Sequence, residues 1–125
     1  MASVLAIYDP GQKITGRATG AAVSRGRILK IAGSKVDGGN ILVAHCGVRD
    51  AAIGASEYDA VQDACTSIMR NGTVAPIEAG GTVTAGAWVE VLADGRVQDY
   101  SAGTRVGVAI SRGASGEFPL IDLKL

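Results

Sequence analysis

The sequence predicts an all-β protein, a small β-barrel or β-sandwich domain built from two pseudo-repeated halves with an extended N-terminal arm. Three observations support this fold class: a strong hairpin signal in residues 83–100, a correspondence between two distant parts of the chain, and the composition. The chain of 125 residues has 18 Gly against 3 Pro, which favours many tight turns. Only 4% of its residues are aromatic, so the core must be built from Val, Ile, Leu and Ala.

The hairpin signal is the segment VTAGAWVEVLADGRVQDY. It reads as a strand, an Asp94-Gly95 turn and a returning strand, because a two-residue type I′ turn needs residues that tolerate positive φ. Alternate residues of a strand face opposite sides of a sheet. The pattern therefore directs one set of side chains toward a core and the other outward: Val89, Val91 and Ala93 against Trp88, Glu90 and Leu92.

Two offsets relate the first part of the chain to the second. Residues 23–31 align with residues 83–91 at an offset of 60, and residues 53–55 align with 106–108 at an offset of 53. Such self-similarity predicts two related halves of about 55 to 60 residues. We expect a single β-domain over residues 23–125, with pseudo-repeats at 23–78 and 83–125, preceded by an arm over residues 1–22.

Strands are expected wherever apolar residues alternate between turn signals. Residues 57–70 are ambiguous, because Tyr58, Val61, Cys65 and Ile68 recur at helical spacing, whereas Asn71-Gly72 is typical of a type I′ hairpin turn. The offset of 53 favours a turn near 57–63 and a strand from about 65. The expected strands cover residues 27–32, 41–46, 52–56, 65–70, 73–78, 87–93, 96–100, 104–111 and 118–125, with Val106, Val108 and Ile110 sharing one face.

Charge is unevenly distributed although the formal net charge is zero. Residues 1–35 contain six basic residues and one acidic residue, so the rest of the chain is net negative. The arm begins with Val4, Leu5, Ile7 and Tyr8, and ten extended residues would reach about 33 Å. A basic, partly apolar arm suits an acidic partner surface. An edge strand of the same domain, or charges that merely solvate strand faces, remain alternatives.

Neither a membrane span nor a secretory signal is recognisable. No apolar run approaches the ~20 residues that a spanning helix needs, and the N-terminus lacks the basic and long apolar regions of a signal peptide. We therefore expect no membrane partner and folding in a cytoplasm, with Cys46 and Cys65 as free buried thiols.

Candidates for catalysis are few. His45 is the only histidine, and neighbouring Cys46 would point to the opposite face of a strand, so the two are poorly placed to bind one metal. A nucleophilic pair of Cys65 and His45 would require the fold to bring them together. The glycine-rich segments lack the Lys-Ser/Thr of a phosphate loop, and there are too few aromatics for a nucleic-acid surface. We expect no enzymatic activity, no cofactor, no metal and no direct nucleic-acid partner.

Seven short motifs follow one another along nearly the whole chain: DPGQKITGRAT at residues 9–19, VSRGR at 23–27, IGA at 53–55, YDA at 58–60, RNGTV at 70–74, VTAGA at 83–87 and VGVA at 106–109. In this order they resemble the capsid decoration (cement) proteins of tailed bacteriophages. Each motif consists of common turn and strand residues, so the resemblance depends on their order. The chain departs from the family pattern at residues 61–64, where a small-residue turn with Gly-Asp is usual.

The resemblance implies a β-rich virion structural protein that binds the outer surface of an assembled capsid as a homotrimer. It would be synthesised in the host bacterial cytoplasm, contact the major capsid protein and stabilise contacts between capsomers. Candidate residues for capsid or subunit contacts come from the arm and from the central strand: Val4, Leu5, Ile7, Tyr8, Lys13, Arg17 and Trp88. Packing of Trp88 under a loop of its own subunit is an alternative.

Two other functions remain open. A non-catalytic carbohydrate- or surface-binding β-module of a phage tail or cell surface would need an exposed aromatic platform, for which Trp88 with one Tyr is the candidate. A small β-barrel enzyme would need a deep pocket lined with titratable groups.

Overall fold

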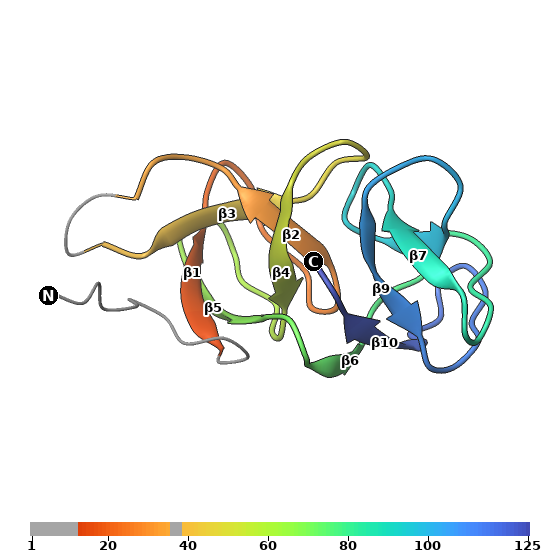
Figure 1. Ribbon diagram of the computed structural model, residues 1–125. Coiled ribbons are helices and arrows are strands. Elements are labelled where there is room, and N and C mark those ends of the chain that lie inside the picture. Colours follow the sequence, from red (N-terminus) through yellow and green to blue (C-terminus); the bar gives the residue numbers. More distant parts are fainter. Residues whose placement is uncertain (1–12, 36–38) are drawn as a thin grey trace, which may run out of the picture.

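The computed structural model describes residues 13–35 and 39–125, which form ten strands and, within these ranges, no helix. The all-β prediction is confirmed. In chain order the strands are β1 (Ile14–Ala18), β2 (Ile28–Ile31), β3 (Ile41–His45), β4 (Ala52–Ser56), β5 (Cys65–Met69), β6 (Val74–Pro76), β7 (Trp88–Val91), β8 (Val97–Asp99), β9 (Arg105–Ala109) and β10 (Leu120–Leu123). The first five and the last five form two bodies that lie side by side (Figure 1).

The first half is a closed five-stranded barrel with the strand order β1-β3-β2-β4-β5. Its closure depends on β1, which pairs antiparallel with β5 on one side and parallel with β3 on the other. Closing the sheet removes the exposed strand edges that would otherwise be free to pair with other chains. The ambiguous segment 57–70 resolves as predicted, with a turn followed by strand β5.

The second half repeats this topology. Its strand order is β6-β10-β9-β7-β8. The first barrel has the equivalent order β1-β5-β4-β2-β3 when it is read from β1 in the direction of β5. In place of the β1–β3 pairing, a single parallel bridge joins Ala79 to Val97. A β-bulge follows Leu29 in β2 and Val89 in β7, which are 60 positions apart. The two halves are therefore structural repeats that share irregularities as well as strand order.

The predicted boundaries need correction. Residues 14–18, placed in the arm 1–22, form β1 of the first barrel, because their alternating apolar residues face its interior. Likewise β6, assigned to the repeat 23–78, pairs with β10 and belongs to the second half. The halves thus run from β1 to β5 and from β6 to β10. The rest of the predicted arm, residues 1–12, lies outside the described residues.

Both predicted type I′ turns are also wrong. Of Asp94 and Gly95, only Gly95 has positive φ, and the amide of Gly95 donates to the carbonyl of Leu92 across a longer loop. The Asn71-Gly72 turn does not close a hairpin at all. It connects β5 of the first half to β6 of the second, where Gly72 donates its N–H to the carbonyl of Leu123.

Residue Val106 shows how a bulge alters the expected alternation. Register in the β7–β9 pair shifts so that Val89 faces Gly107 while Glu90 faces Arg105, which leaves Val106 as the extra residue. Val106 is consequently buried, whereas Ile110 is 54% exposed. The prediction that Val106, Val108 and Ile110 share one face is therefore wrong for Val106.

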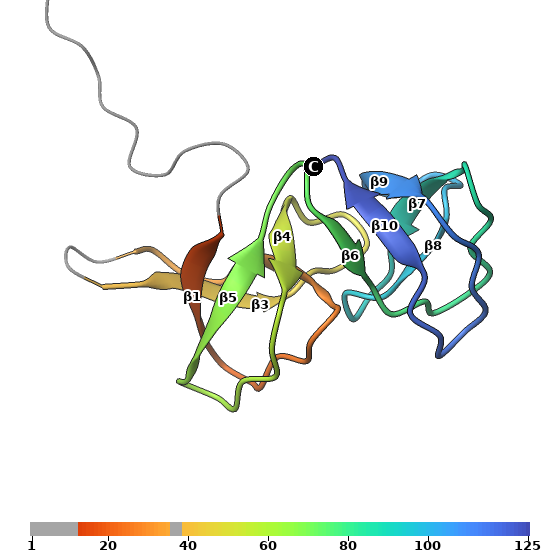
Figure 2. The same ribbon diagram turned by 90° about the horizontal axis from the view of Figure 1, so that it is seen from below.

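A buried cluster joins the two halves. One apolar cluster fills the first barrel, while the other fills the second half and also includes four residues on the outside of the first barrel: Ile28, Cys46, Ala55 and Met69. At the edge of this contact Arg27 of the first half donates to Glu78 at 3.3 Å and to the carbonyl of Asp94 at 3.1 Å. The C-terminus lies at the same junction in both ribbon views (Figure 2), with the amide of Leu125 bonded to Asn71.

Candidate functional site

Among the described residues, the outer side of the second sheet carries the largest group of exposed apolar side chains on neighbouring strands. Trp88 of β7 lies opposite Val108 of β9, and Tyr100, just after β8, donates its N–H to the carbonyl of Trp88. Residues opposite one another in register project from the same face of a sheet. We call this surface the outer apolar face; its exposed members are Val74, Trp88, Tyr100, Ile110 and Leu120.

Arg105 orders the aromatic part of this face. Its guanidinium carbon lies 5.2 Å from the centroid of the Trp88 ring and 4.5 Å from that of Tyr100, so the cation contacts both rings. Each exposed contact of this kind contributes about 0.5–1 kcal/mol. Trp88 is 41% exposed and Tyr100 39% exposed. Trp88 is therefore not covered by any loop of the described residues, and an aromatic-cation group is available on the surface.

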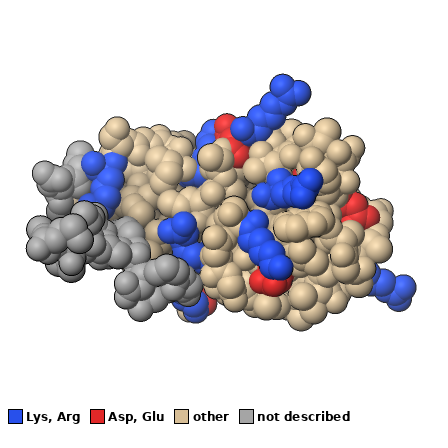
Figure 3. Space-filling model, in the orientation of Figure 1, with Lys and Arg blue, Asp and Glu red and all other residues tan. Residues whose placement is uncertain are grey.

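Few charges interrupt this surface. Over β7, β9 and β10 the face shown in Figure 3 is mostly uncharged, with a few separate basic and acidic side chains. The one acidic side chain of β10, Asp122, is paired with Lys124 at 3.9 Å. Depletion of charge together with Trp, Tyr and Arg is the composition found in the centres of protein–protein interfaces.

Glu90, expected beside Trp88 on the outward face, is 4% exposed. Its two carboxylate oxygens accept the N–H groups of Ser101 (2.7 Å) and Gly103 (2.8 Å). A Cβ on Gly103 would lie 2.2 Å from Oε2 of Glu90, so the glycine allows the loop to approach. Glu90 thus fixes loop 101–103, which connects Tyr100 to Arg105.

The two described basic candidates lie on β1 and its N-terminal side, in the first half. The ammonium of Lys13 is 2.6 Å from the carboxylate of Glu57, and the Lys13 hydrogen bond lowers the pKa of Glu57. Arg17 donates to the carbonyl of Asp63 at 3.1 Å. Both side chains are about half exposed, whereas Trp88 lies on the other half, so the structure does not bring these three candidates together. The remaining candidates, Val4, Leu5, Ile7 and Tyr8, lie outside the described residues.

The histidine and cysteines occupy separate environments. Nε2 of His45 accepts the N–H of Ser24 at 2.9 Å, and burial lowers the pKa of His45, which favours the neutral ring needed for that bond. Cys46 is buried, with its thiol pKa raised to about 11 by desolvation, whereas Cys65 is exposed; both are free. His45 lies on β3 and Cys65 on β5, with β1 between these strands, so the considered nucleophilic pair is not assembled.

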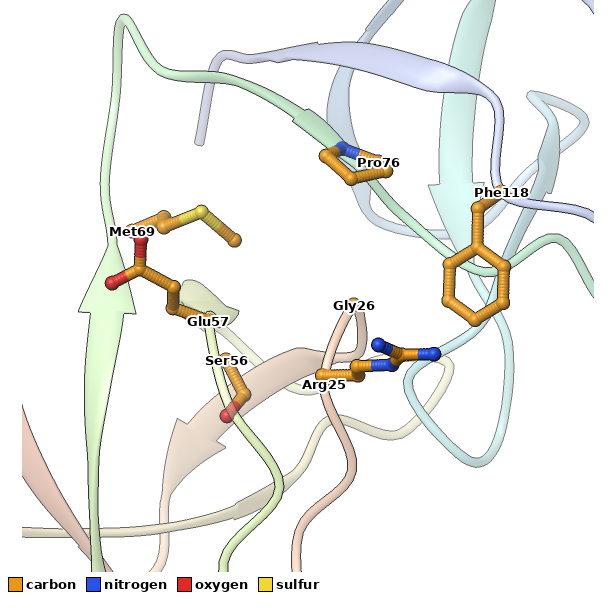
Figure 4. Close-up of a pocket in the computed structure, with 7 residues that line it drawn as sticks. All are labelled: Arg25, Gly26, Ser56, Glu57, Met69, Pro76 and Phe118. Atoms are coloured by element: carbon orange, nitrogen blue, oxygen red, sulfur yellow. The ribbon is translucent and has the colours of Figure 1, made fainter.

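A crevice of about 440 Å³ lies where the two halves meet (Figure 4). Of its seven lining residues only Arg25 and Glu57 are titratable, and they carry opposite charges. The guanidinium of Arg25 reaches over the ring of Phe118, 5.9 Å from its centroid.

Within the described ranges no group of three or more His, Cys, Asp or Glu side chains could hold a metal ion. The part of the chain described by the structure also has no helix long and apolar enough to cross a membrane.

Arg105, Tyr100, Ile110 and Leu120 were not among the predicted contact residues. Alternation along 104–111 and 118–125 indicates which residues share a strand face, but neither segment reveals which strands are neighbours. The placement of Arg105 between two rings also depends on the bulge in the β7–β9 pair.

Comparison with known proteins gives a fold relationship. No family model and no curated protein matches the sequence. Among solved structures, the head fiber gp8.5 N base in bacteriophage phi29 superposes with a TM-score of 0.70 at 18% sequence identity. The match covers 90% of this chain and 93% of that chain, so the two share a fold over almost their full compared lengths.

Proposed function

We propose that this chain is a structural protein of a bacteriophage virion, which binds the outer surface of the assembled capsid as a trimer and stabilises contacts between capsomers. The observation that carries the proposal is the fold match to a phage head fiber base over nearly the whole of both chains. The order of motifs that resembles capsid decoration proteins supports the same class independently of that match.

The outer apolar face supports a role in binding a protein surface. Trp88, Tyr100 and Arg105 are the residue types that most often dominate interface energetics. A standard stable interface buries about 1,600 Å² in total. If each trimer contacts several capsomers, separating those capsomers requires several contacts to break together, and the combined binding is far stronger than that of one contact. The major capsid protein is the partner that this mechanism requires.

Co-sedimentation with assembled phage shells tests the proposal. Wild-type protein is expected to pellet with shells of the matching phage and to saturate at a fixed ratio of copies to capsomers. Two groups of variants separate the candidate contacts. Trp88→Ala tests the outer apolar face, whether that face contacts the shell directly or holds the trimer together, and a triple change of Val4, Leu5 and Ile7 to Ser tests the arm. Unchanged occupancy with the triple variant would remove the arm from the capsid contact.

Carbohydrate binding is the second candidate, and the exposed pair of Trp88 and Tyr100 favours it. Flat aromatic rings on a surface can stack against sugar rings. A glycan array distinguishes the two functions, since capsid binding predicts no glycan signal. Glycan binding that is lost in Trp88→Ala, together with no shell binding, would favour the carbohydrate-binding module.

A further inference from the structure

Equivalent surfaces of the two halves have different surroundings. In the first half, Cys46 donates its N–H to the carbonyl of Ile28 at 2.8 Å, and Tyr100 donates to Trp88 at 2.8 Å in the second. In the first half Ile28 is paired with Ala55 and Ala55 with Met69. In the second half Trp88 is paired with Val108 and Val108 with Asp122. Two outward-facing rows therefore correspond strand by strand: Cys46, Ile28, Ala55 and Met69 in the first half, and Tyr100, Trp88, Val108 and Asp122 in the second.

The first row is buried and the second is not. Ile28, Cys46 and Ala55 are fully buried, because the second half of the same chain packs over them. Trp88 and Tyr100, at the corresponding positions, are 41% and 39% exposed. The outer apolar face is thus the surface that, by internal symmetry, a further half-domain would cover.

Three residues of the second half lie on its side that packs over the outward-facing row of the first half. Glu78 and Asp94 bond to Arg27, and Phe118 lies against Gly26, where a Cβ would be 2.9 Å from its ring. Next to them, the carbonyl of Gly95 accepts the N–H of Ile28 at 2.8 Å.

The corresponding side of the first half is exposed. The parallel pair Ala18–Val43 matches Ala79–Val97, and Ile68 of β5 matches Ile121 of β10. These matches align Glu78, Asp94 and Phe118 with three exposed residues, which we call the first-barrel edge: Arg17, Asn40 and Cys65. They are neighbours, since Nδ2 of Asn40 lies 3.3 Å from Sγ of Cys65 and Arg17 faces Cys65 across the β1–β5 ladder.

We propose that the outer apolar face of one copy of this chain packs against the first-barrel edge of a second copy. The contact between subunits would bring together the surfaces that correspond to those joined within a chain. It would lack the internal backbone bonds of Glu78 to Gly26 and of Ile28 to Gly95, because the equivalent positions of the first half are paired in the β1–β3 ladder. Such a head-to-tail contact uses two different surfaces, and it forms a closed ring when the rotation between copies permits closure. In the proposed trimer six half-domains would alternate around the ring, and each outer apolar face would be covered by the neighbouring subunit. The inference rests on the proposed function only for the number of subunits.

The contact between copies is expected to be weaker than the internal one. Arg27, which pairs with Glu78 and Asp94, corresponds to Ala87, and Arg17 and Asn40 replace the two acidic residues. The ionic part of the internal junction is therefore not repeated, and the contact depends on Trp88 and its apolar neighbours. Assembly should accordingly depend on protein concentration.

Light scattering behind size exclusion, over a series of concentrations, is the first measurement. The wild type is expected to approach three times 12.6 kDa as concentration rises. Leu120→Asp places a charge on the outer apolar face and should yield monomer. Val61→Asp is the matched control, because Val61 is 72% exposed in the turn before β5 and lies on neither surface, so this variant should assemble normally.

Mixing two variants tests the head-to-tail arrangement. Cys65→Glu disrupts the first-barrel edge and, like Leu120→Asp, should be monomeric alone. Each variant keeps the surface that the other lacks, so an equimolar mixture should form a heterodimer and nothing larger. Assembly of Cys65→Glu alone into a dimer through paired outer apolar faces would overturn the proposal.

A cross-linking experiment locates the contact by residue. Within the chain Arg25 lies over Phe118, and these positions correspond to Ala85 and Cys65. A short bis-maleimide should therefore couple A85C to the native Cys65 of another copy, giving covalent dimers and trimers. The double variant A85C/C65S should give none. Absence of coupling in A85C, or a wild type that stays monomeric at every concentration, would refute the proposed contact.

These readouts are separate from capsid binding. A monomeric protein that still saturates phage shells would refute the subunit contact and leave the virion function standing. A ring that forms as described but binds no shell would support the contact and count against the virion function.

Discussion

Replacing Glu90 by Gln is expected to destabilise the fold by about 1.5–3 kcal/mol. Glu90 is nearly fully buried, and its two oxygens accept the amides of Ser101 and Gly103 at 2.7 and 2.8 Å. Gln keeps one acceptor but directs an NH₂ group at the second amide, so one charge-assisted bond is lost and a buried donor remains without an acceptor. For a chain of this length the melting temperature should fall by roughly 5–12 °C.

Urea denaturation followed by the fluorescence of Trp88 measures this loss directly. Glu117→Gln is the matched control, because Glu117 is exposed and accepts one amide, that of Ala114, at 2.7 Å. The free energy of unfolding of Glu117→Gln should differ from that of the wild type by no more than about 0.5 kcal/mol, as for most surface substitutions. If Glu90→Gln also stayed within that limit, the buried carboxylate would not be what holds loop 101–103.

Three further predictions concern thiols, acid and the close approach of strands. Cys65 should react with a thiol reagent in the folded protein and Cys46 only after unfolding, because burial raises the Cys46 pKa to about 11; two reactive thiols in native protein would contradict this. The hydrogen bond from Arg96 lowers the pKa of Asp94 below its ordinary value of 3.8. Ionised Asp94 therefore stabilises the fold fully above pH 3.8, and this stabilisation is lost as the pH falls through the lowered pKa. In Asp94→Asn the free energy of unfolding should therefore fall less steeply as the pH decreases below about 4. A slope equal to that of the wild type would refute this. Gly107→Ala should cost about 1–3 kcal/mol in urea, since its Cβ would lie 2.3 Å from the carbonyl of Asp122, whereas Gly33→Ala meets only a flexible side chain at 3.1 Å; equal losses would contradict the argument.

Sequence patterns predicted the repeated fold because both halves keep apolar residues at matching positions. The offsets of 60 and 53 correspond to the structural equivalence of β2 with β7 and of β4 with β9. The offset of 53 also resolved the ambiguity at residues 57–70 in favour of a turn followed by a strand. Helical spacing there was misleading, since Tyr58 and Val61 are exposed turn residues.

Features that depend on strand pairing could not be predicted in this way. Strand β1 reads as part of an arm until its pairing with β5 and β3 is known. The turn at Asp94-Gly95 has a residue pair typical of type I′, yet the register of β7 and β8 requires a longer loop in which Gly95 alone has positive φ. Local residue preferences were outweighed in both cases by tertiary contacts.

The candidate site was predicted in part. The prediction placed Trp88 on the outward side of a central strand, where the structure has it, because Trp88 precedes the bulge after Val89. Alternation failed beyond the bulge, since Glu90 was expected on the same side and is buried. Its partners Arg105 and Tyr100 come from other strands, so their approach required the sheet order and the bulge after Val89. Lys13 and Arg17 are exposed as a surface role requires, although each also contacts an acidic residue of its own chain.

The most direct test of the proposed function is the temperature at which DNA-filled phage particles lose their DNA, with and without this protein bound. Particles at full occupancy should release DNA at a higher temperature than bare particles, and the difference should disappear with Trp88→Ala at the same added concentration. An identical release temperature for bare and fully occupied particles would contradict a role in stabilising the shell.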